Sequence, residues 1–441
     1  MWIEELAIEN IRCFESAKLR FSRHGQPCKW VTLLGENSGG KSTILQSIAL
    51  LLAGPEGSQQ LAPRPIGWLR DEEKVGKIGT RIHQGNQDPG QHGDTKVRKV
   101  FGYSFNLTGS RKLTVNQKVY TEPTIVPIGQ HVLTWLRENA LNSKGTGWFA
   151  VGYGAFRRLT RSSQIIVPSL EPQARFTNFL SQFREDEALA TFERWMVYLD
   201  YRIAKGKGDE AAQHQKQLGV DAINQVLPRQ VKFHSVSPEG RILFDVGGAV
   251  VQTIALSDGY RSVLALTGDL IWRLIQAFPG SKNPLVEEGV VLIDELDIHL
   301  HPKWQREIAG WLRSIFPNLQ FIIATHSPLI AAGAGEDSLT LCCQMVDGVS
   351  QVSEVENVAA KSVDAILQSP AFGLVSAFAP ATQTKLDRFD VLSRKAKRTS
   401  AEEDERQMLL NFVEVARPYG GPPEPGSLDA KVEAFLEKTL S

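Results

Sequence analysis

The sequence of 441 residues lacks net charge, a long apolar run and a cysteine-rich pattern. Lys plus Arg and Asp plus Glu both number 49, so the chain as a whole has no attraction to nucleic acid, and any DNA contact has to be local. Its apolar runs fall well short of the roughly 18 residues of a membrane span, and residues 1–5 lack the basic start of a signal peptide. We therefore expect a cytoplasmic protein without membrane contact.

Cysteine is scarce. The chain has four cysteines, none in a CxxC arrangement, and two of them, Cys342 and Cys343, are adjacent in an apolar stretch. This pattern favours reduced thiols in the core over disulfides or zinc ligands. With 42% hydrophobic and 22% charged residues, the composition is that of a globular protein long enough for two or three domains.

A glycine-rich segment at residues 35–43 fits the phosphate-binding pattern GxxxxGKS. It follows an apolar run at 30–34, typical of a buried strand, and precedes a run at 43–52 with helical spacing, which we expect to stop at Gly54. Here the backbone N–H groups can surround phosphates, and Lys41 can neutralise their charge. A chance glycine turn is the alternative, and the flanking strand and helix disfavour it. The predicted nucleotide-binding residues of this loop are Gly35, Asn37, Ser38, Gly39, Gly40, Lys41, Ser42 and Thr43.

Two carboxylates follow a second buried run, at residues 290–293, in the form of a Walker B motif. Asp294 is predicted to hold Mg²⁺ together with the hydroxyl of Ser42, and Glu295 to polarise the attacking water. An acidic turn after a core strand is the alternative. His326 follows the next predicted strand, at 319–324, where it could bond the γ-phosphate or could be structural. Lys41, Glu295 and His326 are thus the predicted catalytic residues.

The turn at residues 256–262, LSDGYRS, begins a predicted helix at 259–278. Because the phosphate loop already occupies one side of the nucleotide, a second anion-binding helix start is best explained as serving another subunit. The protein would then be a homodimer or higher homo-oligomer with ATP at the interface, and this turn, which contains Ser257 and Gly259, would lie there. An ordinary Ser N-cap is the alternative.

Five parts are expected along the chain. An α/β start at 1–56 contains strands near 3–8 and 17–21 and the phosphate loop, and 57–147 is an inserted β-rich lobe with strand pieces at 99–105 and 112–116. A lid follows at 148–229, with a buried strand at 148–154 and helical spacing at 177–205. Strands and helices at 230–355, beginning with strands at 231–246, complete a parallel sheet. The tail at 356–441 is helical, with Ser400 and Glu403 in a capping-box pattern and a last helix after 426.

The motifs IENIRCF at 8–14, GENSGGKST, LSDGYRS, LIDELDIHLHP at 292–302 and ATHSP at 324–328 occur in this order. Together they resemble the ABC-type ATPases of the SMC/RecF group, and more closely the AAA-family ATPases of OLD and Septu-like defence systems. The resemblance implies an α/β ABC-type ATPase head with a mixed sheet. It also implies that Arg12 reaches the phosphates and that residues 297–301 cross the dimer interface.

The chain departs from this family at two places. Family members usually carry a Gln at the end of the strand entering the lid, which couples Mg²⁺ to lid motion, whereas residues 153–157 are YGAFR. OLD proteins carry a C-terminal nuclease that needs a glutamate and a later Asp-x-Asp cluster on strands, and residues 330–441 show no such cluster. Glu354 and Glu356 are interpreted as a solvated face, and we expect no nuclease within this chain.

Two basic clusters remain. Arg157, Arg158 and Arg161 near the lid could contact DNA or phosphate or simply be solvated, and the run at 394–398 favours a solvated face. His299 and His301 are better explained by the interface loop than by a metal site.

The leading hypothesis is an ATP- and Mg²⁺-dependent ATPase switch that dimerises around ATP. By resemblance it would control an effector in trans, such as an HNH-type nuclease, in bacterial anti-phage defence. The alternatives are a DNA-repair ATPase that clamps DNA, and the ATPase subunit of a transporter.

Overall fold

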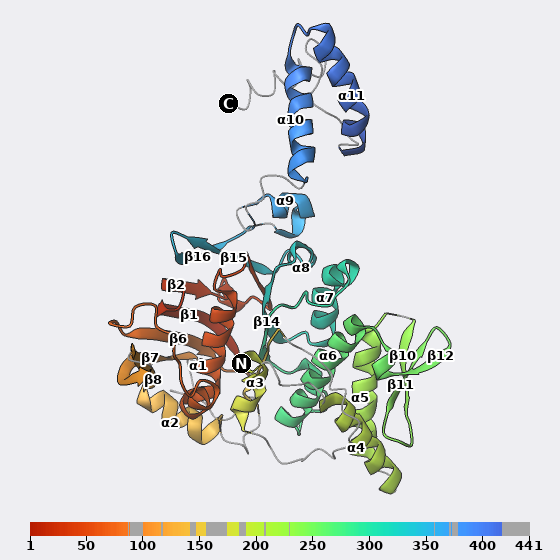
Figure 1. Ribbon diagram of the computed structural model, residues 1–441. Helices are drawn as coiled ribbons and strands as arrows, with labels where there is room; N and C mark the ends of the chain where they lie inside the picture. Colours follow the sequence, from red (N-terminus) through yellow and green to blue (C-terminus); the bar gives the residue numbers. More distant parts are fainter. Residues whose placement is uncertain are drawn as a thin grey trace. The chain divides into compact units, whose positions relative to one another are not determined.

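The computed structural model describes residues 1–86, 88, 100–115, 118–141, 147–155, 174–184, 191–206, 209–228, 230–356, 358–369, 372 and 378–416. The chain divides into two compact units. The first comprises Met1–Ile366 with a short piece around residue 372, and the second contains the last two described helices (Figure 1). No helix in the described ranges is long and apolar enough to cross a membrane.

An antiparallel sheet forms one layer of the first unit. Its order is β2-β1-β6-β7-β8. The strands are β1 (Trp2–Ile11), β2 (Phe14–Arg20), β6 (Gly76–His83), β7 (Val100–Val115) and β8 (Lys118–Ile128). The two strand pieces expected at 99–105 and 112–116 form the single long strand β7. Strands from the expected lobe thus continue the sheet that β1 and β2 begin, because β6 pairs directly with β1.

A mixed sheet forms the second layer, in the order β16-β15-β5-β14-β13-β9. All its pairings are parallel except that of β15 with β16. The strands are β5 (Trp30–Leu34), β9 (Phe149–Tyr153), β13 (Gly289–Ile293), β14 (Leu319–Thr325), β15 (Leu339–Val346) and β16 (Val349–Glu354). Every residue of β5, β9, β13 and β14 is buried, which confirms the predicted parallel sheet.

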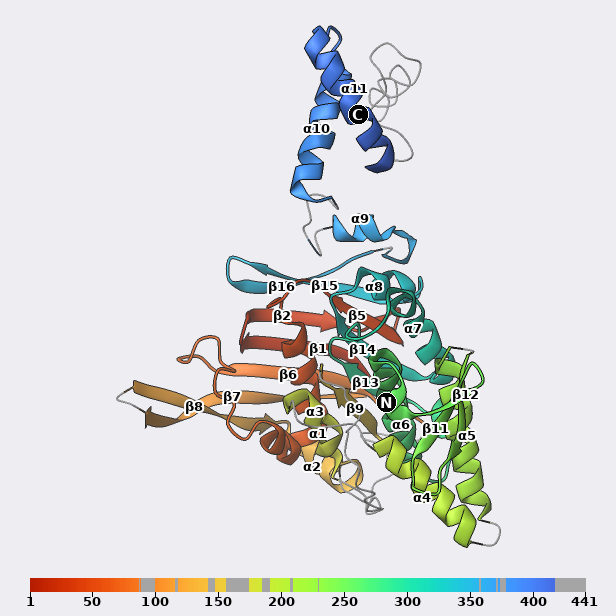
Figure 2. The same ribbon diagram turned by 45° about the vertical axis from the view of Figure 1, so that its right-hand side comes forward.

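Apolar residues on both faces of the mixed sheet enter two separate cores. Figure 2 shows the antiparallel sheet on one side of the mixed sheet and α4, α5 and α6 on the other. One face packs against α1 (Lys41–Leu61), α2 (Gln130–Asn139) and the antiparallel sheet. The other face packs against α4 (Thr191–Lys205), α5 (Glu210–Val226), α6 (Asp258–Ala277) and α7 (Pro302–Ile315). Cys342 and Cys343 are buried free thiols in β15, as predicted, and burial raises the pKa of Cys343 to about 12.

Helix α1 differs from the prediction, which ended it at Gly54. Gly54 has φ 76°, and the helix resumes after it with Pro55 and continues to Leu61. The left-handed φ at glycine breaks the first segment, and proline, which lacks an N–H, is well suited to begin the next. The result is a kink instead of an end.

The expected lid helix at 177–205 is divided into several pieces. A 3₁₀ turn η1 (Arg175–Phe179) runs into α3 (Leu180–Phe183), and Arg184 then has an extended backbone before α4 begins at Thr191. After α5 comes a small antiparallel sheet of β10 (Val231–Val236), β11 (Ile242–Val246) and β12 (Ala249–Gln252).

Short elements complete the first unit. They are β3 (Ser22–Arg23), β4 (Gln26–Pro27), η2 (Thr253–Ala255), η3 (Pro284–Val286), α8 (Pro328–Gly333), η4 (Val358–Ala360) and α9 (Val363–Leu367). The end of β16 carries Glu354, and both it and Glu356 are exposed, as expected of a solvated face.

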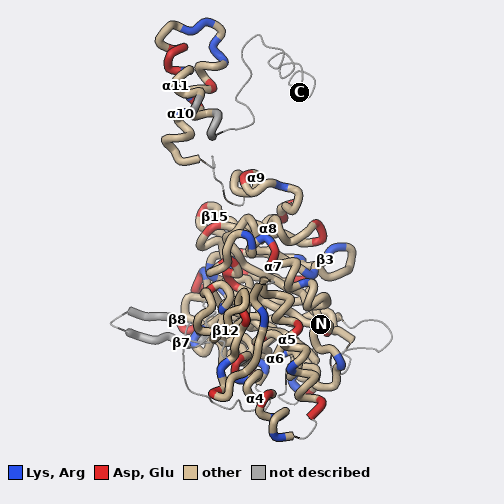
Figure 3. Tube along the Cα trace, turned by 90° about the vertical axis from the view of Figure 1, so that its right-hand side faces the viewer, with Lys and Arg blue, Asp and Glu red and all other residues tan. Residues whose placement is uncertain are grey.

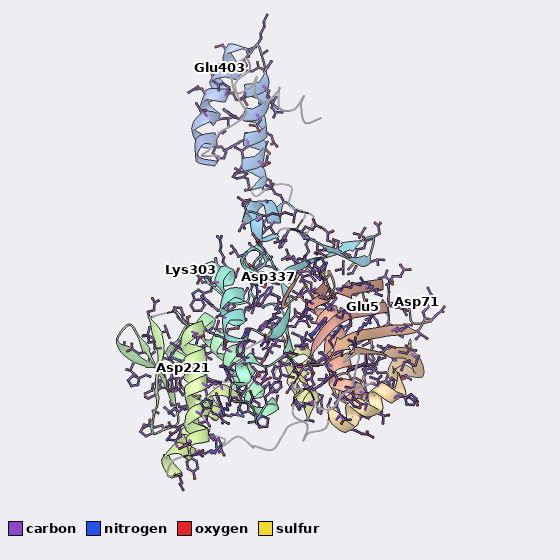
Figure 4. All side chains as sticks on the ribbon, turned by 180° about the vertical axis from the view of Figure 1, so that it is seen from behind. Glu5, Asp71, Asp221, Lys303, Asp337 and Glu403 are labelled. Atoms are coloured by element: carbon purple, nitrogen blue, oxygen red, sulfur yellow. The ribbon has the colours of Figure 1, made fainter. Side chains whose placement is uncertain are left out.

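The second unit is a pair of helices, α10 (Pro380–Arg394) and α11 (Ser400–Ala416), joined by a small core of Leu386, Phe389 and Val413. The capping box lies one residue earlier than predicted. Thr399 Oγ1 accepts from the backbone N–H of Glu402, whose carboxylate accepts from the N–H of Thr399. Two residues of the basic run before α11 are paired, Lys395 with Glu402 and Arg398 with Glu403. Figure 3 shows the basic residues between α10 and α11, and Glu403 is labelled in Figure 4. The helix expected after 426 lies outside the described residues.

Candidate nucleotide site

Three glycines shape the phosphate loop between β5 and α1. A Cβ on Gly35 or Gly39 would collide with the backbone carbonyl of Cys343 in β15, and one on Gly40 would lie 2.6 Å from the Phe14 ring. Gly35 and Gly40 also have positive φ, 146° and 89°. Because only glycine fits such positions, these three residues let the loop lie closely against β15 and β2.

Lys41 lies at the start of α1 and is 6% exposed. Its Nζ donates to the carbonyls of Gly35 at 2.9 Å and Glu36 at 2.7 Å. Burial lowers its pKa, and the neighbouring Asp294, Glu295 and Asp297 act in the opposite direction. The first turn of α1 contains no acidic residue. A buried cation at a helix N-terminus suits a phosphate group.

Asp294 and Glu295 follow β13 directly. The backbone N–H of Asp294 donates to Tyr153 of β9 at 2.8 Å, and that of Leu296 donates to Ala324 of β14 at 3.2 Å, which fixes the turn between its two neighbouring strands. Glu295 has φ 47°. A non-glycine residue held in this region carries strain of about 1–3 kcal/mol and is common at active sites.

The chain offers donors that fit Mg²⁺. Ser42 is exposed at the end of the phosphate loop, and Asp294 is close enough to Lys41 to influence its pKa. No group of three or more His, Cys, Asp or Glu side chains able to hold a metal occurs among the described residues. A site built from one hydroxyl, one carboxylate and substrate phosphates is typical of Mg²⁺, which seldom has an all-protein cage.

Residues beyond the Walker B pair hold the end of β14. Asp297 Oδ1 accepts from Thr325 Oγ1 at 2.5 Å and from the backbone N–H of His326 at 3.3 Å. Gln305 Nε2 donates to the Asp297 carbonyl at 3.3 Å, and its Oε1 accepts from Ser327 at 2.7 Å. Asp297 therefore links the Walker B turn to His326. No sequence motif singles out Gln305.

His301 has a local role as the N-cap of α7. Its Nδ1 accepts from the backbone N–H of Lys303, a residue labelled in Figure 4, at 3.3 Å. His299, with φ 67°, lies in the preceding loop. The structure thus gives His301 a capping function, while the proposed passage of residues 297–301 across a dimer interface stays a prediction.

Arg12 lies in the turn between β1 and β2. Its guanidinium lies over the Trp68 ring, 4.1 Å from the centroid, and Nη1 donates to Gln46 Oε1 of α1 at 2.7 Å. Arg12 itself has φ 44°, and burial lowers its pKa. Its contact with α1 is compatible with the phosphate-directed role that the resemblance implies. Sequence reasoning missed Gln46, although it lies one helical turn after Ser42.

Ser257 and Gly259 lie at the start of α6. Ser257 is the N-cap residue and is exposed, yet its side chain makes no capping hydrogen bond to its own helix. A Cβ on Gly259 would lie 2.8 Å from the His299 carbonyl, so the turn packs against the loop after Glu295. The ordinary N-cap alternative is therefore disfavoured. Arg157, Arg158 and Arg161 lie outside the described residues.

Sequence comparison adds to this geometry. Residues 31–332 match the family described as "AAA domain, putative AbiEii toxin, Type IV TA system". The "Retron Vc95 probable ATPase" of Vibrio cholerae serotype O1 biovar El Tor is 37% identical over 375 residues, which cover 74% of this chain and 71% of that protein. The "Septu protein PtuA" of Bacillus mycoides (strain KBAB4) is 26% identical over 400 residues. That match covers 89% of this chain but only 47% of PtuA, so the chain spans about half the length of this relative.

Among solved structures, the SMC head bound to the C-winged helix domain of ScpA aligns with 82% of this chain and 99% of that chain. The sequence identity is 15% and the TM-score 0.48, which is too low to bear on function. The match over residues 31–332 includes the phosphate loop, the carboxylates after β13 and His326. The chain therefore belongs to this AAA-domain family and is an ATPase.

Proposed function

We propose that this chain is an ATP-dependent switch of the ABC type in which two copies, arranged head to tail, enclose ATP. One observation carries the proposal: Ser257 is exposed at the N-terminus of α6 and does not cap its own helix. The phosphate loop with Lys41 already serves the nucleotide of its own chain. A second exposed helix start, pressed against the Walker B loop through Gly259, suits the nucleotide of a neighbouring copy.

The residues divide the chemistry between them. Lys41 and the loop amides bind the phosphates, and Glu295 orients and polarises the water that attacks the γ-phosphorus, which releases ADP and phosphate. Mg²⁺, held by Ser42 and Asp294, would supply neutralisation of phosphate charge. The hydrogen bond from the backbone N–H of His326 to Asp297, at the end of β14, supports a role for the His326 side chain in bonding the γ-phosphate.

The biological setting follows from the relatives. Proteins named Septu PtuA and retron ATPase support a role in bacterial anti-phage defence. In this role the closed and open dimers would hold or release an effector in trans, such as an HNH-type nuclease.

The test is the variant Glu295→Gln, which keeps the side chain's shape but cannot act as a base. With ATP and Mg²⁺ we expect ATPase turnover to fall at least a hundredfold and the mass in solution to shift from monomer to a stable dimer. Glu239→Gln, an exposed residue between β10 and β11, is the matched control and should behave as the wild type. A Glu295→Gln protein that stays monomeric with undiminished turnover would overturn the proposal.

The DNA-clamp alternative makes a different prediction. It requires ATP-dependent, salt-sensitive DNA binding that is lost on replacing Arg157 or Arg158. In Figure 3, Lys and Arg are interspersed with Asp and Glu along the described trace, and Arg157 and Arg158 lie outside the described residues.

A further inference from the structure

We infer that residues 175–183, comprising η1 and α3, form a bridge that couples the phosphate-loop helix α1 to α6, with Gln46 and Asn178 as its two positioning residues. The inference rests on the proposed function, because α6 begins with the turn offered to the neighbouring copy. Side-chain amides hold both ends of this bridge segment.

At the α1 end, Gln46 uses both atoms of its amide. Its Nε2 donates to the backbone carbonyl of Gln182 at 2.8 Å, and its Oε1 accepts from Arg12 Nη1 at 2.7 Å. Gln46 lies four residues after Ser42, on the same face of α1. A shift of the Arg12 guanidinium toward a phosphate therefore changes the bond that orients Gln46, and with it the hold on α3.

At the α6 end, Asn178 also uses both amide atoms. Its Oδ1 accepts from Arg273 Nη1, and its Nδ2 donates to the carbonyl of Ala150 in β9 at 2.9 Å. Arg273 Nε donates in turn to Asp269 Oδ2 at 2.6 Å, and the Tyr153 hydroxyl donates to the same oxygen at 2.9 Å. Asp269 is fully buried in α6, and the nearby carboxylate and burial raise the pKa of Tyr153. This network fixes α6 to the strand beside β13.

The bridge segment lies directly on β9. A Cβ on Gly152 would collide with the Gln182 side chain, and one on Gly154 would collide with the Ser181 carbonyl. Ser181 Oγ donates to the Gly152 carbonyl at 3.0 Å. Because β9 pairs with β13, which ends in the catalytic carboxylates, movement of this segment also acts on that edge of the sheet.

The buried amide of Gln182 destabilises the present position of the bridge segment. It is 8% exposed, and neither its Oε1 nor its Nε2 has a hydrogen-bond partner among the described residues. A buried amide left in this state costs about 1–3 kcal/mol. A second position of the bridge segment, in which the Gln182 amide gains a hydrogen-bond partner, would therefore be favoured over the present one.

The experiment compares Gln46→Met, which keeps the length of the side chain but removes both hydrogen bonds, with Gln217→Met. Gln217 lies on α5, and its Nε2 donates to Asp221 Oδ1 of the same helix at 2.8 Å, so it is the matched control. For Gln46→Met we expect KM for ATP within about twofold of the wild type, kcat reduced at least tenfold, and weaker ATP-dependent dimerisation in the Glu295→Gln background. The control should leave all three unchanged.

Asn178→Ala provides an independent variant and a double-mutant cycle. If both residues act on one bridge, the double variant loses little more kcat than either single variant. Multiplicative losses, an unchanged kcat, or a loss confined to KM would overturn the inference. These outcomes are distinct from failure of the proposed function, which would appear as wild-type turnover by a monomer that ATP never dimerises.

Discussion

At the residue scale, the backbone of Glu295 links activity to stability. Its φ of 47° is unfavourable for an L-residue with a long side chain. This conformation sets the direction of the Glu295 side chain. It cannot relax without moving the turn after β13, which is hydrogen-bonded to β9 and β14. We therefore regard the strain as part of the site.

Replacement by glycine tests this. Glu295→Gly should raise the free energy of unfolding by about 0.5–1 kcal/mol, because glycine tolerates this φ, while ATP turnover is lost. Asp347→Gly, with φ 49° in the turn between β15 and β16, should stabilise comparably or less and keep turnover. Urea unfolding and an ATPase assay on both variants measure these effects. A destabilised Glu295→Gly protein would show that the turn is not strained.

At the element scale, α1 depends on the kink at Gly54. Gly54→Ala should lower the free energy of unfolding by about 1–3 kcal/mol, because its φ of 76° with ψ 178° is a conformation that essentially only glycine adopts. Gly310 in α7 offers the opposite case, since a Cβ there meets nothing within 4 Å. Gly310→Ala should stabilise by about 0.5–1 kcal/mol. Equal effects of the two substitutions would contradict this account.

The capping box of α11 gives a second prediction at this scale. Thr399→Ala should speed hydrogen exchange of the first-turn amides of α11, whereas Ser400→Ala should leave it unchanged. Lys395 and the Thr399 amide lower the pKa of Glu402 from 4.5 to about 2. Its contribution is therefore fully present above about pH 4.5 and is lost as the pH falls through about 2. Exchange that slows on acidification beyond the intrinsic pH effect would contradict this.

The sequence predicts some elements well and others not at all, for physical reasons. β5 and β13 are buried throughout, so their apolar runs stand out locally next to Lys41 and Asp294. The pairing of β6 with β1 depends on contacts between residues distant in the chain. The local sequence pattern predicts an inserted β-rich lobe and does not show that its strands join the sheet of β1. Gln182 is brought beside Gly152 only by the fold, so no local motif announces it. The sequence predicts that Gly54 breaks the helix, but whether a helix resumes after Gly54 depends on which residues pack against the following segment.

At the scale of the whole molecule, a head-to-tail pair has a signature in mixing experiments. Lys41→Ala removes a chain's own phosphate contact, and Ser257→Arg blocks the turn that it offers to its neighbour. Each variant alone should be inactive. A mixed pair contains one site with both an intact Lys41 and an intact Ser257, so equal amounts of the two variants should regain turnover, up to about a quarter of the wild-type value if chains pair at random.

As a control, each single variant is mixed with the double variant Lys41→Ala/Ser257→Arg. Neither of these mixtures contains a site with both an intact Lys41 and an intact Ser257. Turnover in the mixture of the two single variants, and none in the control mixtures, would support shared sites. Full activity of Ser257→Arg alone would mean that each chain hydrolyses ATP without help from another.

The contact between Gly259 and the His299 carbonyl has a kinetic consequence. Within one chain, the turn offered to a neighbour rests on the loop that starts at Glu295. Binding of the neighbour's nucleotide to this turn would thus affect the loop that carries Glu295 in the same chain, and the two active sites would not hydrolyse ATP independently. The rate would rise sigmoidally with ATP concentration, with a Hill coefficient between 1 and 2 for two linked sites. An ATPase built in this way responds to a threshold in nucleotide supply and not in proportion to it.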